Sequence, residues 1–242
     1  MGASYSPNIV KDGLIFYIDA ANPKSYPKSG TIVDSFMEGY SGSFVNDVTF
    51  SPSSLGNWEF DGVDDYIDFG QASGGGFTSA LDPQLNNFTA NVFFEIDNSN
   101  TTTNVIIGKG CGSSNIIGWL IWYSEIDDIL YLRCSGQNSN DQRATRSYPI
   151  DKDKIYMATL VIDREQDKFF GYLNGENPTG GSFDITGFDS IISPNKFLLG
   201  ARHNSPLFSL KGNIYLAQIY NRALSAQEVK QNYNALKGRF GL

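Results

Sequence analysis

Short apolar runs, rich in β-branched and aromatic residues, recur along the whole chain and are separated by residues that favour tight turns. The runs occupy residues 14–19, 58–60, 66–69, 89–96, 105–108, 116–123, 129–134, 155–163, 168–173, 196–201 and 213–220. Asn174-Gly175 between two runs is the strongest hairpin signal, because both central residues of that turn take positive φ. Short strands at regular spacing predict an antiparallel sandwich or barrel.

One helix is predicted, close to the C-terminus. Ser225 and Glu228 have the spacing of a capping box, in which each side chain bonds the backbone of the other residue. Val229, Tyr233 and Leu236 then recur at i, i+4 and i+7. We therefore expect a short amphipathic helix that packs on the outside of the sandwich.

No shift in composition and no internal repeat divides the chain, so we expect a flexible N-terminal arm over residues 1–12 and a single domain over residues 13–242. The net charge of −8, from 18 Lys plus Arg against 26 Asp plus Glu, argues against a nucleic-acid partner, which would need a basic patch. The longest apolar run, residues 116–123, is too short to span a bilayer. The N-terminus lacks the pattern of a secretory signal, so we expect neither a signal peptide nor a transmembrane segment.

The chain has one His and two Cys, too few for a four-ligand Cys/His zinc site. Two free thiols, Cys111 and Cys134, fit folding in a reducing compartment, although the spacing leaves a disulfide between them open. If residues 116–123 and 129–134 pair across a turn, Trp119 lies opposite Cys134.

Four groups of motifs carry a family resemblance. They are residues 58–67 (WEFDGVDDYI), 106–110 with 118–120, 171–175 (GYLNG), and 212–214 with 219–225. In this order and spacing they resemble the laminin-G-like jelly roll of the concanavalin A-like lectin/glucanase superfamily, over about residues 14–237. The resemblance implies an all-β fold, a two-sheet antiparallel jelly-roll sandwich with one short C-terminal helix.

A second resemblance lies in residues 13–26 (GLIFYIDAANPKSY), which are similar to a segment at the start of such domains in tailed-phage virion proteins, especially of marine and cyanobacterial phages. It implies a virion protein assembled in the host cytoplasm, either a capsid decoration or a tail or fibre component. Such a protein acts by docking and display. Its partners would be other capsid or tail proteins, and we expect it to be oligomeric in the particle.

The alternative function is a lectin-like carbohydrate-binding module that attaches the particle to host-surface polysaccharide. Long polar loops are the expected recognition surface, over residues 98–104, 136–145 and 175–182. The candidate glycan-binding residues are Tyr123, Asn138, Asn140 and Asn177. Alternation sends Trp119 and Trp122 to opposite faces of one strand, and because both faces are apolar we expect both side chains in the core.

The same superfamily contains glycosidases, whose retaining members use two nearby carboxylates. Residues 125–130 (EIDDIL) resemble the start of the E-x-D-x-x-E arrangement of those enzymes. Leu130 and Tyr131 stand where the second Glu is needed, and the segment falls in a predicted hairpin turn. The lone His203 has no nucleophile signature beside it. We therefore predict no catalytic residues and no enzymatic activity.

Calcium is the one cofactor that the sequence suggests, since many relatives of this fold bind it through oxygen ligands. Asp61 and Asp64 are the candidate ligands, in a turn that Asp65 and Asp68 also crowd. The alternative is that Asp61 accepts hydrogen bonds from nearby amides of the turn. Tyr215 stands where calcium-binding relatives often carry an Asp, which removes one expected ligand.

Overall fold

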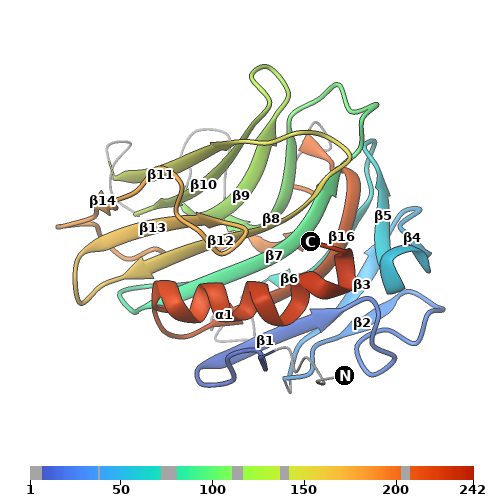
Figure 1. Cartoon of the computed structure of the whole chain (residues 1–242), viewed down its shortest axis with the longest axis horizontal. Helices are drawn as coiled ribbons and strands as arrows, with labels where there is room; N and C mark the ends of the chain where they lie inside the picture. Colours follow the sequence, from blue (N-terminus) through green and yellow to red (C-terminus); the bar gives the residue numbers. More distant parts are fainter. Residues whose placement is uncertain (1–6, 38, 72–80, 111–116, 137–141, 203–207) are drawn as a thin grey trace, which may run out of the picture.

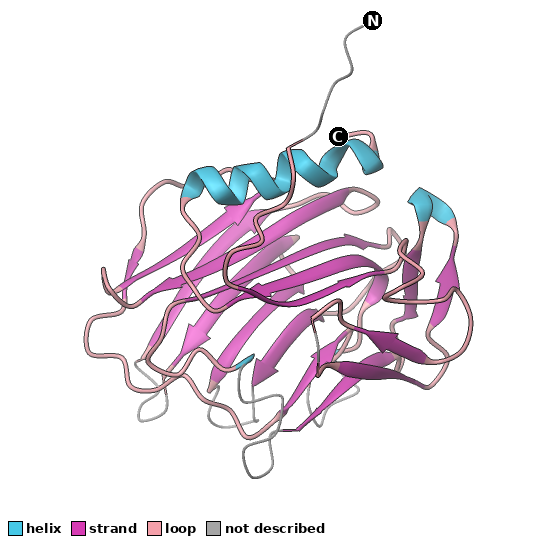
Figure 2. Ribbon diagram, turned by 90° about the horizontal axis from the view of Figure 1, so that it is seen from below, coloured by secondary structure: helices cyan, strands magenta, loops and turns pink. Residues whose placement is uncertain are grey.

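The computed structural model describes residues 7–37, 39–71, 81–110, 117–136, 142–202 and 208–242. In this part of the chain two sheets of eight strands each pack face to face, and every strand pair is antiparallel (Figures 1 and 2). This confirms the predicted two-sheet jelly-roll sandwich.

The first sheet has the strand order β14-β13-β12-β7-β16-β5-β4, and β1 also pairs with β16. Its strands are β1 (Leu14–Asp19), β4 (Thr49–Ser51), β5 (Asn57–Asp61), β7 (Phe88–Ile96), β12 (Ile155–Asp163), β13 (Lys168–Leu173), β14 (Phe183–Asp184) and β16 (Lys211–Tyr220).

The second sheet has the order β11-β10-β9-β8-β15-β6-β3-β2. Its strands are β2 (Ile32–Asp34), β3 (Ser41–Val45), β6 (Tyr66–Gln71), β8 (Asn104–Gly110), β9 (Gly118–Ser124), β10 (Ile129–Ser135), β11 (Arg143–Pro149) and β15 (Lys196–Leu199). Trp119 of β9 lies opposite Cys134 of β10, as the hairpin reading predicted. Cys134 is a buried free thiol whose pKa burial raises to about 12, and Cys111 lies outside the described residues.

The core between the sheets is strongly aromatic. Phe16 of the first sheet meets Phe69 and Phe197 of the second edge to face, with ring centroids 5.1 and 5.3 Å apart. Trp58 and Trp119 are also fully buried. Edge-to-face contacts of this kind stabilise a core beyond the area that they bury.

The helix α1 (Ala226–Leu236) lies along the outer face of the first sheet, beside β7 and β16 (Figures 1 and 2). Its predicted capping box is present: Ser225 Oγ accepts from the Glu228 amide, and Glu228 Oε2 accepts from the Ser225 amide. Arg222 adds a two-bond contact to the Glu228 carboxylate, at 2.6 and 3.0 Å. Val229 is buried against the sheet.

The predicted flexible arm is only partly within the described residues, which begin at residue 7. Its described end is held against the domain. The Val10 amide donates to Asn232 Oδ1 at 2.8 Å, and the Tyr220 hydroxyl donates to the Val10 carbonyl at 3.0 Å. These two buried bonds place the boundary of any free arm before Val10.

One ion pair is completely buried inside the sandwich. Lys109 Nζ of β8 lies 2.5 Å from Asp82 Oδ2, and both side chains are fully buried. Lys109 also donates to the Ser193 carbonyl, while Asp82 Oδ1 accepts from the Ser193 amide. Burial raises the pKa of Asp82, and the hydrogen bond from Lys109 opposes that rise. The pair therefore ties β8 to the segments that precede β7 and β15.

We predict that Lys109→Met lowers the free energy of unfolding by about 3–5 kcal/mol, because it leaves the Asp82 carboxylate without its buried partner. The double variant Lys109→Met/Asp82→Asn should recover much of the loss, since Asn keeps the acceptor for the Ser193 amide. Urea unfolding measures the free energy of unfolding of the single and the double variant. Lys154→Met, which breaks the exposed pair with Asp151, is the control and should change little. A Lys109→Met variant as stable as the unmodified protein would contradict this assignment.

The Glu228 contacts make part of the stability depend on pH. The hydrogen bonds from Arg222, followed by those from Ser225, lower the pKa of Glu228 from 4.5 to about 2. A carboxyl whose pKa is lower in the folded state stabilises the fold above its unfolded pKa, and loses that effect as pH falls toward the folded value. We expect Glu228→Gln to be destabilising at pH 7, with the difference from the unmodified protein shrinking between about pH 4.5 and pH 2. Thermal unfolding across that range tests this, and a difference independent of pH would argue against it.

Candidate functional site

The two faces of β9 have different surroundings. Trp119, Ile121 and Tyr123 point into the core and are fully buried, and the Trp119 indole N–H donates to the Leu81 carbonyl at 2.8 Å. Trp122 lies on the opposite, outer face of the second sheet and is only half-buried. The expectation that Trp122 is a core residue is therefore wrong. Alternation correctly separated the faces, but a strand pattern does not say whether a further layer covers the second face.

Trp122 is part of an ordered row of side chains on this outer face. Its ring stacks on that of Tyr131, the residue directly opposite on β10, with centroids 4.8 Å apart and ring planes 14° apart. The guanidinium carbon of Arg133 lies 4.5 Å from the centre of the Trp122 ring. Arg133 Nε donates to Thr145 Oγ1 at 3.0 Å, and the Tyr131 hydroxyl donates to Asp127 Oδ2 at 2.7 Å. Cross-strand stacking and hydrogen bonds thus hold the row in one arrangement.

A shallow pocket of about 130 Å³ lies beside this row, and we call it the arginine–aromatic pocket. The buried Val105 and Leu120 are apolar members of its lining. Phe208 also lines it, with the Arg202 guanidinium 4.9 Å from its ring centre. The complete described lining is Thr103, Val105, Leu120, Trp122, Arg133, Arg202 and Phe208. Small-ligand sites share this combination of an apolar lining with a few polar groups, but they usually enclose about 300–1,000 Å³, so this pocket would hold only part of a ligand.

Of the four predicted glycan-binding residues, the structure describes Tyr123 and Asn177, and neither belongs to the described lining of this pocket. Tyr123 is fully buried and its hydroxyl donates to Asp128, so its ring offers no face to a sugar; burial also raises the pKa of the phenol. Asn138 and Asn140 lie outside the described residues. The side-chain nitrogen Nδ2 of Asn177 donates to the Gly181 carbonyl at 2.8 Å within its own loop, and a role for Asn177 in binding stays a prediction.

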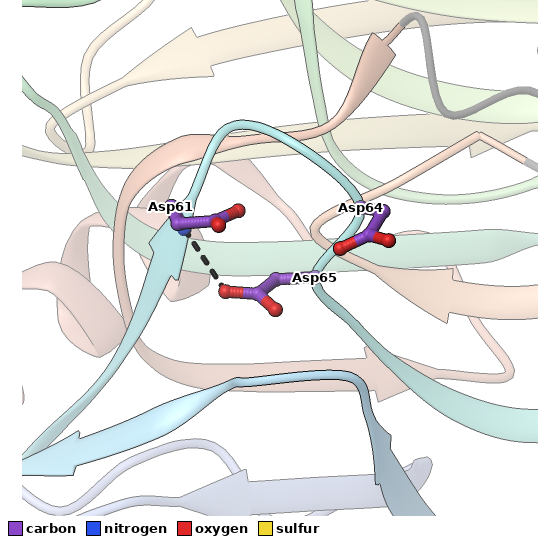
Figure 3. Close-up of side chains that lie close together, drawn as sticks. All are labelled: Asp61, Asp64 and Asp65. Carbon is purple, nitrogen blue, oxygen red and sulfur yellow. Dashed lines mark hydrogen bonds between the residues drawn. The ribbon is translucent and has the colours of Figure 1, made fainter.

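The predicted calcium ligands lie in the turn between β5 and β6 (Figure 3). Carboxylate oxygens of Asp61, Asp64 and Asp65 all lie within 4.8 Å of one another. The buried Asp65 accepts from the amides of Asp47 and Asp61, and Asp61 Oδ1 accepts from the Val63 amide at 2.7 Å. Burial raises the pKa of Asp65, the two amides oppose this, and the charges of Asp61 and Asp64 add to the rise. The carboxylates therefore shape the turn and also concentrate negative charge.

Two neighbours alter the charge around this turn. Asp68 forms an ion pair with Lys196 at 2.5 Å, so its carboxylate is engaged elsewhere. Lys211 lines a groove of about 520 Å³ together with Asp61 and Asp65, and therefore places a positive charge beside the cluster. Carboxylate oxygens of this kind are suitable calcium ligands, and Lys211 partly offsets their charge. Calcium binding at Asp61 and Asp64 remains a prediction.

If calcium binds there, adding Ca²⁺ should raise the midpoint of thermal unfolding, because a ligand that binds only the folded state stabilises it. Asp61→Asn and Asp64→Asn should each remove the shift, and Asn at position 61 retains an oxygen for the Val63 amide. Asp127→Asn, in the β9–β10 turn, is the matched control. An unfolding midpoint that does not respond to Ca²⁺ would rule the site out.

The sequence profile of the concanavalin A-like lectin/glucanases superfamily matches residues 61–230, and the chain belongs to this superfamily. No curated protein matches the chain. In the described residues, no helix is both long and apolar enough to cross a membrane.

Solved structures match nearly the whole chain at low identity. Trypanosoma rangeli sialidase in complex with sialic acid matches with a TM-score of 0.70 and 15% identity, covering 98% of this chain and 36% of the sialidase. The binding domain of botulinum neurotoxin serotype D matches with a TM-score of 0.67 and 12% identity, covering 92% of this chain and 51% of the toxin domain. The binding domain of botulinum neurotoxin DC in complex with rat synaptotagmin II matches with a TM-score of 0.67 and 12% identity. The match covers 93% of this chain and 52% of the toxin domain. The chain spans about a third of the sialidases and half of the toxin domains, and at this identity the likeness shows the fold alone.

These matches correct the prediction that the chain is not an enzyme, because several of the matching structures are sialidases. The prediction rested on a missing second carboxylate near residues 125–131, which concerns a single glycosidase mechanism, and on the absence of a nucleophile signature beside His203, which lies outside the described residues. Sialidases instead use a tyrosine nucleophile, so a search for paired carboxylates does not detect them. Residues 125–128 do form the expected turn between β9 and β10. The virion role is not tested by these matches and stays a prediction.

Proposed function

We propose that this domain binds carbohydrate through the arginine–aromatic pocket on the outer face of its second sheet. The observation that carries the proposal is the half-buried Trp122, which lines an apolar pocket opposite the layer that forms the core. Sugar rings have apolar C–H faces, which pack well against aromatic and aliphatic side chains, while their hydroxyls require polar neighbours. Thr103, Arg133 and Arg202 supply such neighbours around the same pocket.

The contrast between the two outer faces supports this location. On the first sheet α1 covers the apolar side chains, and Phe93 stacks on Phe240 with ring centroids 4.9 Å apart. On the second sheet Val105 and Leu120 form a small separate cluster with the half-buried Trp122 and Phe208. An apolar patch that the fold leaves partly open is a common feature of ligand-binding surfaces.

Membership of a superfamily that includes lectins agrees with a carbohydrate ligand. A matching sialidase structure contains sialic acid, although that likeness concerns the fold. Polysaccharide on a host surface is the partner that the sequence predicted for such a module. Display of the domain on a capsid or tail would bring this surface to that partner.

We predict that Trp122→Ala and Phe208→Ala each weaken carbohydrate binding by about tenfold or more, because each removes an aromatic part of the pocket. A glycan array with polysaccharides identifies ligands, and calorimetry then measures their affinity. Ile126→Ala is the matched control, since Ile126 is 90% exposed in the β9–β10 turn and does not line the pocket. Thermal unfolding of each variant verifies that it is folded. Unchanged affinity in both pocket variants, or the absence of any glycan ligand, would refute the proposal.

A further inference from the structure

A second pocket, of about 350 Å³, lies where the ends of three segments of the first sheet meet. Tyr220 at the end of β16 pairs with Leu14 at the start of β1 and with Thr89 near the start of β7. Small-ligand sites usually enclose about 300–1,000 Å³, so this volume suffices for a whole ligand. We call it the amide pocket, because four carboxamide side chains line it: Gln84, Asn86, Asn87 and Asn221.

Hydrogen bonds hold the backbone around the amide pocket in place. The Gln84 amide donates to the Ile191 carbonyl and the Ile191 amide donates to the Gln84 carbonyl, both at 3.0 Å. The Asn221 amide donates to the Gly13 carbonyl at 2.9 Å. These bonds join segments that are far apart in the sequence, so the positions from which the carboxamides project are fixed by the fold.

Three of the four carboxamides are available to a ligand. Asn87 uses its side chain within the protein, because it bonds residues 164 and 165. Within the described part of the chain, the side chains of Gln84, Asn86 and Asn221 make no hydrogen bond. Gln84 is half-buried, and Asn86 and Asn221 are exposed. The pocket therefore presents donors and acceptors that the protein itself does not use.

The backbone conformation of Gln84 indicates that its side chain has a role other than stability. Gln84 has a φ of 54°, in the left-handed region, which strains any residue with a Cβ and which Gly adopts freely. Gly at this position would keep both bonds to Ile191, since those are backbone bonds. Residues in such strained conformations cluster at ligand-binding sites.

The chemistry of the amide pocket suits a neutral ligand with many hydroxyl groups. Asp82 is the one charged residue of the described lining, and Lys109 compensates its charge at a distance of 2.5 Å. A charged ligand would thus meet no free opposite charge there. A carboxamide contains a donor and an acceptor, and a hydroxyl group can act as either, so the two kinds of group pair readily.

A peptide fits this pocket less well than a sugar. Peptide ligands are usually recognised by an exposed strand edge or by apolar pockets for their side chains. Two apolar members of the described lining, Pro83 and Phe88, are buried. That leaves the half-buried Ile15, which is the extra residue of a β-bulge between β1 and β16.

We propose that the amide pocket is a second carbohydrate site, which binds a neutral sugar through the carboxamides of Gln84, Asn86 and Asn221. No residue of its described lining belongs to the described lining of the arginine–aromatic pocket, so the two sites are separate. The second site does not require that the first one binds sugar. Two sites on one domain bind a polysaccharide more tightly than either site alone, provided that the polymer spans both.

The test is made in Trp122→Ala protein, in which the arginine–aromatic pocket is impaired. Maltohexaose, cellohexaose, mannohexaose and chitohexaose are each titrated into this protein by calorimetry. We expect at least one of these neutral hexasaccharides to bind. Gln84→Gly, Asn86→Ala and Asn221→Ala, each added to Trp122→Ala, should weaken that binding about fivefold, because each removes hydrogen bonds to the sugar.

Asn98→Ala is the matched control, since Asn98 is also an exposed asparagine but does not line the amide pocket. Thermal unfolding shows whether each variant is folded. We expect Gln84→Gly to be at least as stable as its parent although it binds sugar more weakly. Should Gln84→Gly unfold the protein, Asn86→Ala and Asn221→Ala decide, because they leave the left-handed residue unchanged.

The outcomes separate the two carbohydrate sites. If none of the four hexasaccharides binds the Trp122→Ala protein, the second site is overturned. Binding that the Asn86→Ala and Asn221→Ala variants leave unchanged would also overturn it. If Trp122→Ala binds as tightly as the unmodified protein and the amide-pocket variants bind more weakly, the second site is supported and the first one fails.

Discussion

The alternation of side chains along each strand, which leaves every sheet with two faces, is the constraint on which the rest of this structure depends. The sandwich buries one face of each sheet in an aromatic core around Phe16, Trp58 and Trp119. Each outer face is then either covered by a further element or left partly exposed. On the first sheet α1 covers it (Figure 2). On the second sheet Trp122 and Phe208 remain half-buried around a pocket. The candidate site is thus the face that the described layers leave open.

Local patterns predicted most of the fold. The Asn174-Gly175 turn has φ of 52° and 78°, as its hairpin type requires, and the Ser225–Glu228 capping box starts the helix. The position of the turn between residues 116–123 and 129–134 was enough to predict that Trp119 lies opposite Cys134. These features depend on neighbours within a few residues, and such neighbours can be read from the sequence directly.

The site depends on contacts that local patterns do not contain. Arg202 and Phe208 reach the β9 surface from a segment about 80 residues away, so no spacing in the sequence brings them beside Trp122. Tyr123 was expected at a glycan site, yet it lies on the core side of the strand on which Trp122 lies outside. The expectation that Trp122 lies in the core was wrong because two apolar faces were taken to mean two buried faces. Tyr123 was expected at a glycan site although alternation places it on the same face as the core residue Trp119. Two features of the sequence nevertheless point to the site. Alternation places Trp122 on the face opposite Trp119, and the hairpin places Tyr131 across from Trp122.

The three tryptophans allow the most direct test of whether carbohydrate binds at the open face. Trp58 and Trp119 are buried in the core, and Trp122 lines the pocket, so the three indole N–H signals in an NMR spectrum report core and pocket separately. We would titrate the protein with an oligosaccharide that the glycan array identifies as a ligand and follow these signals, assigned by single substitutions. If carbohydrate binds at the open face, the Trp122 signal shifts progressively to saturation while the signals of Trp58 and Trp119 stay in place. A Trp122 signal that does not move while the oligosaccharide binds, as calorimetry would show, would contradict it.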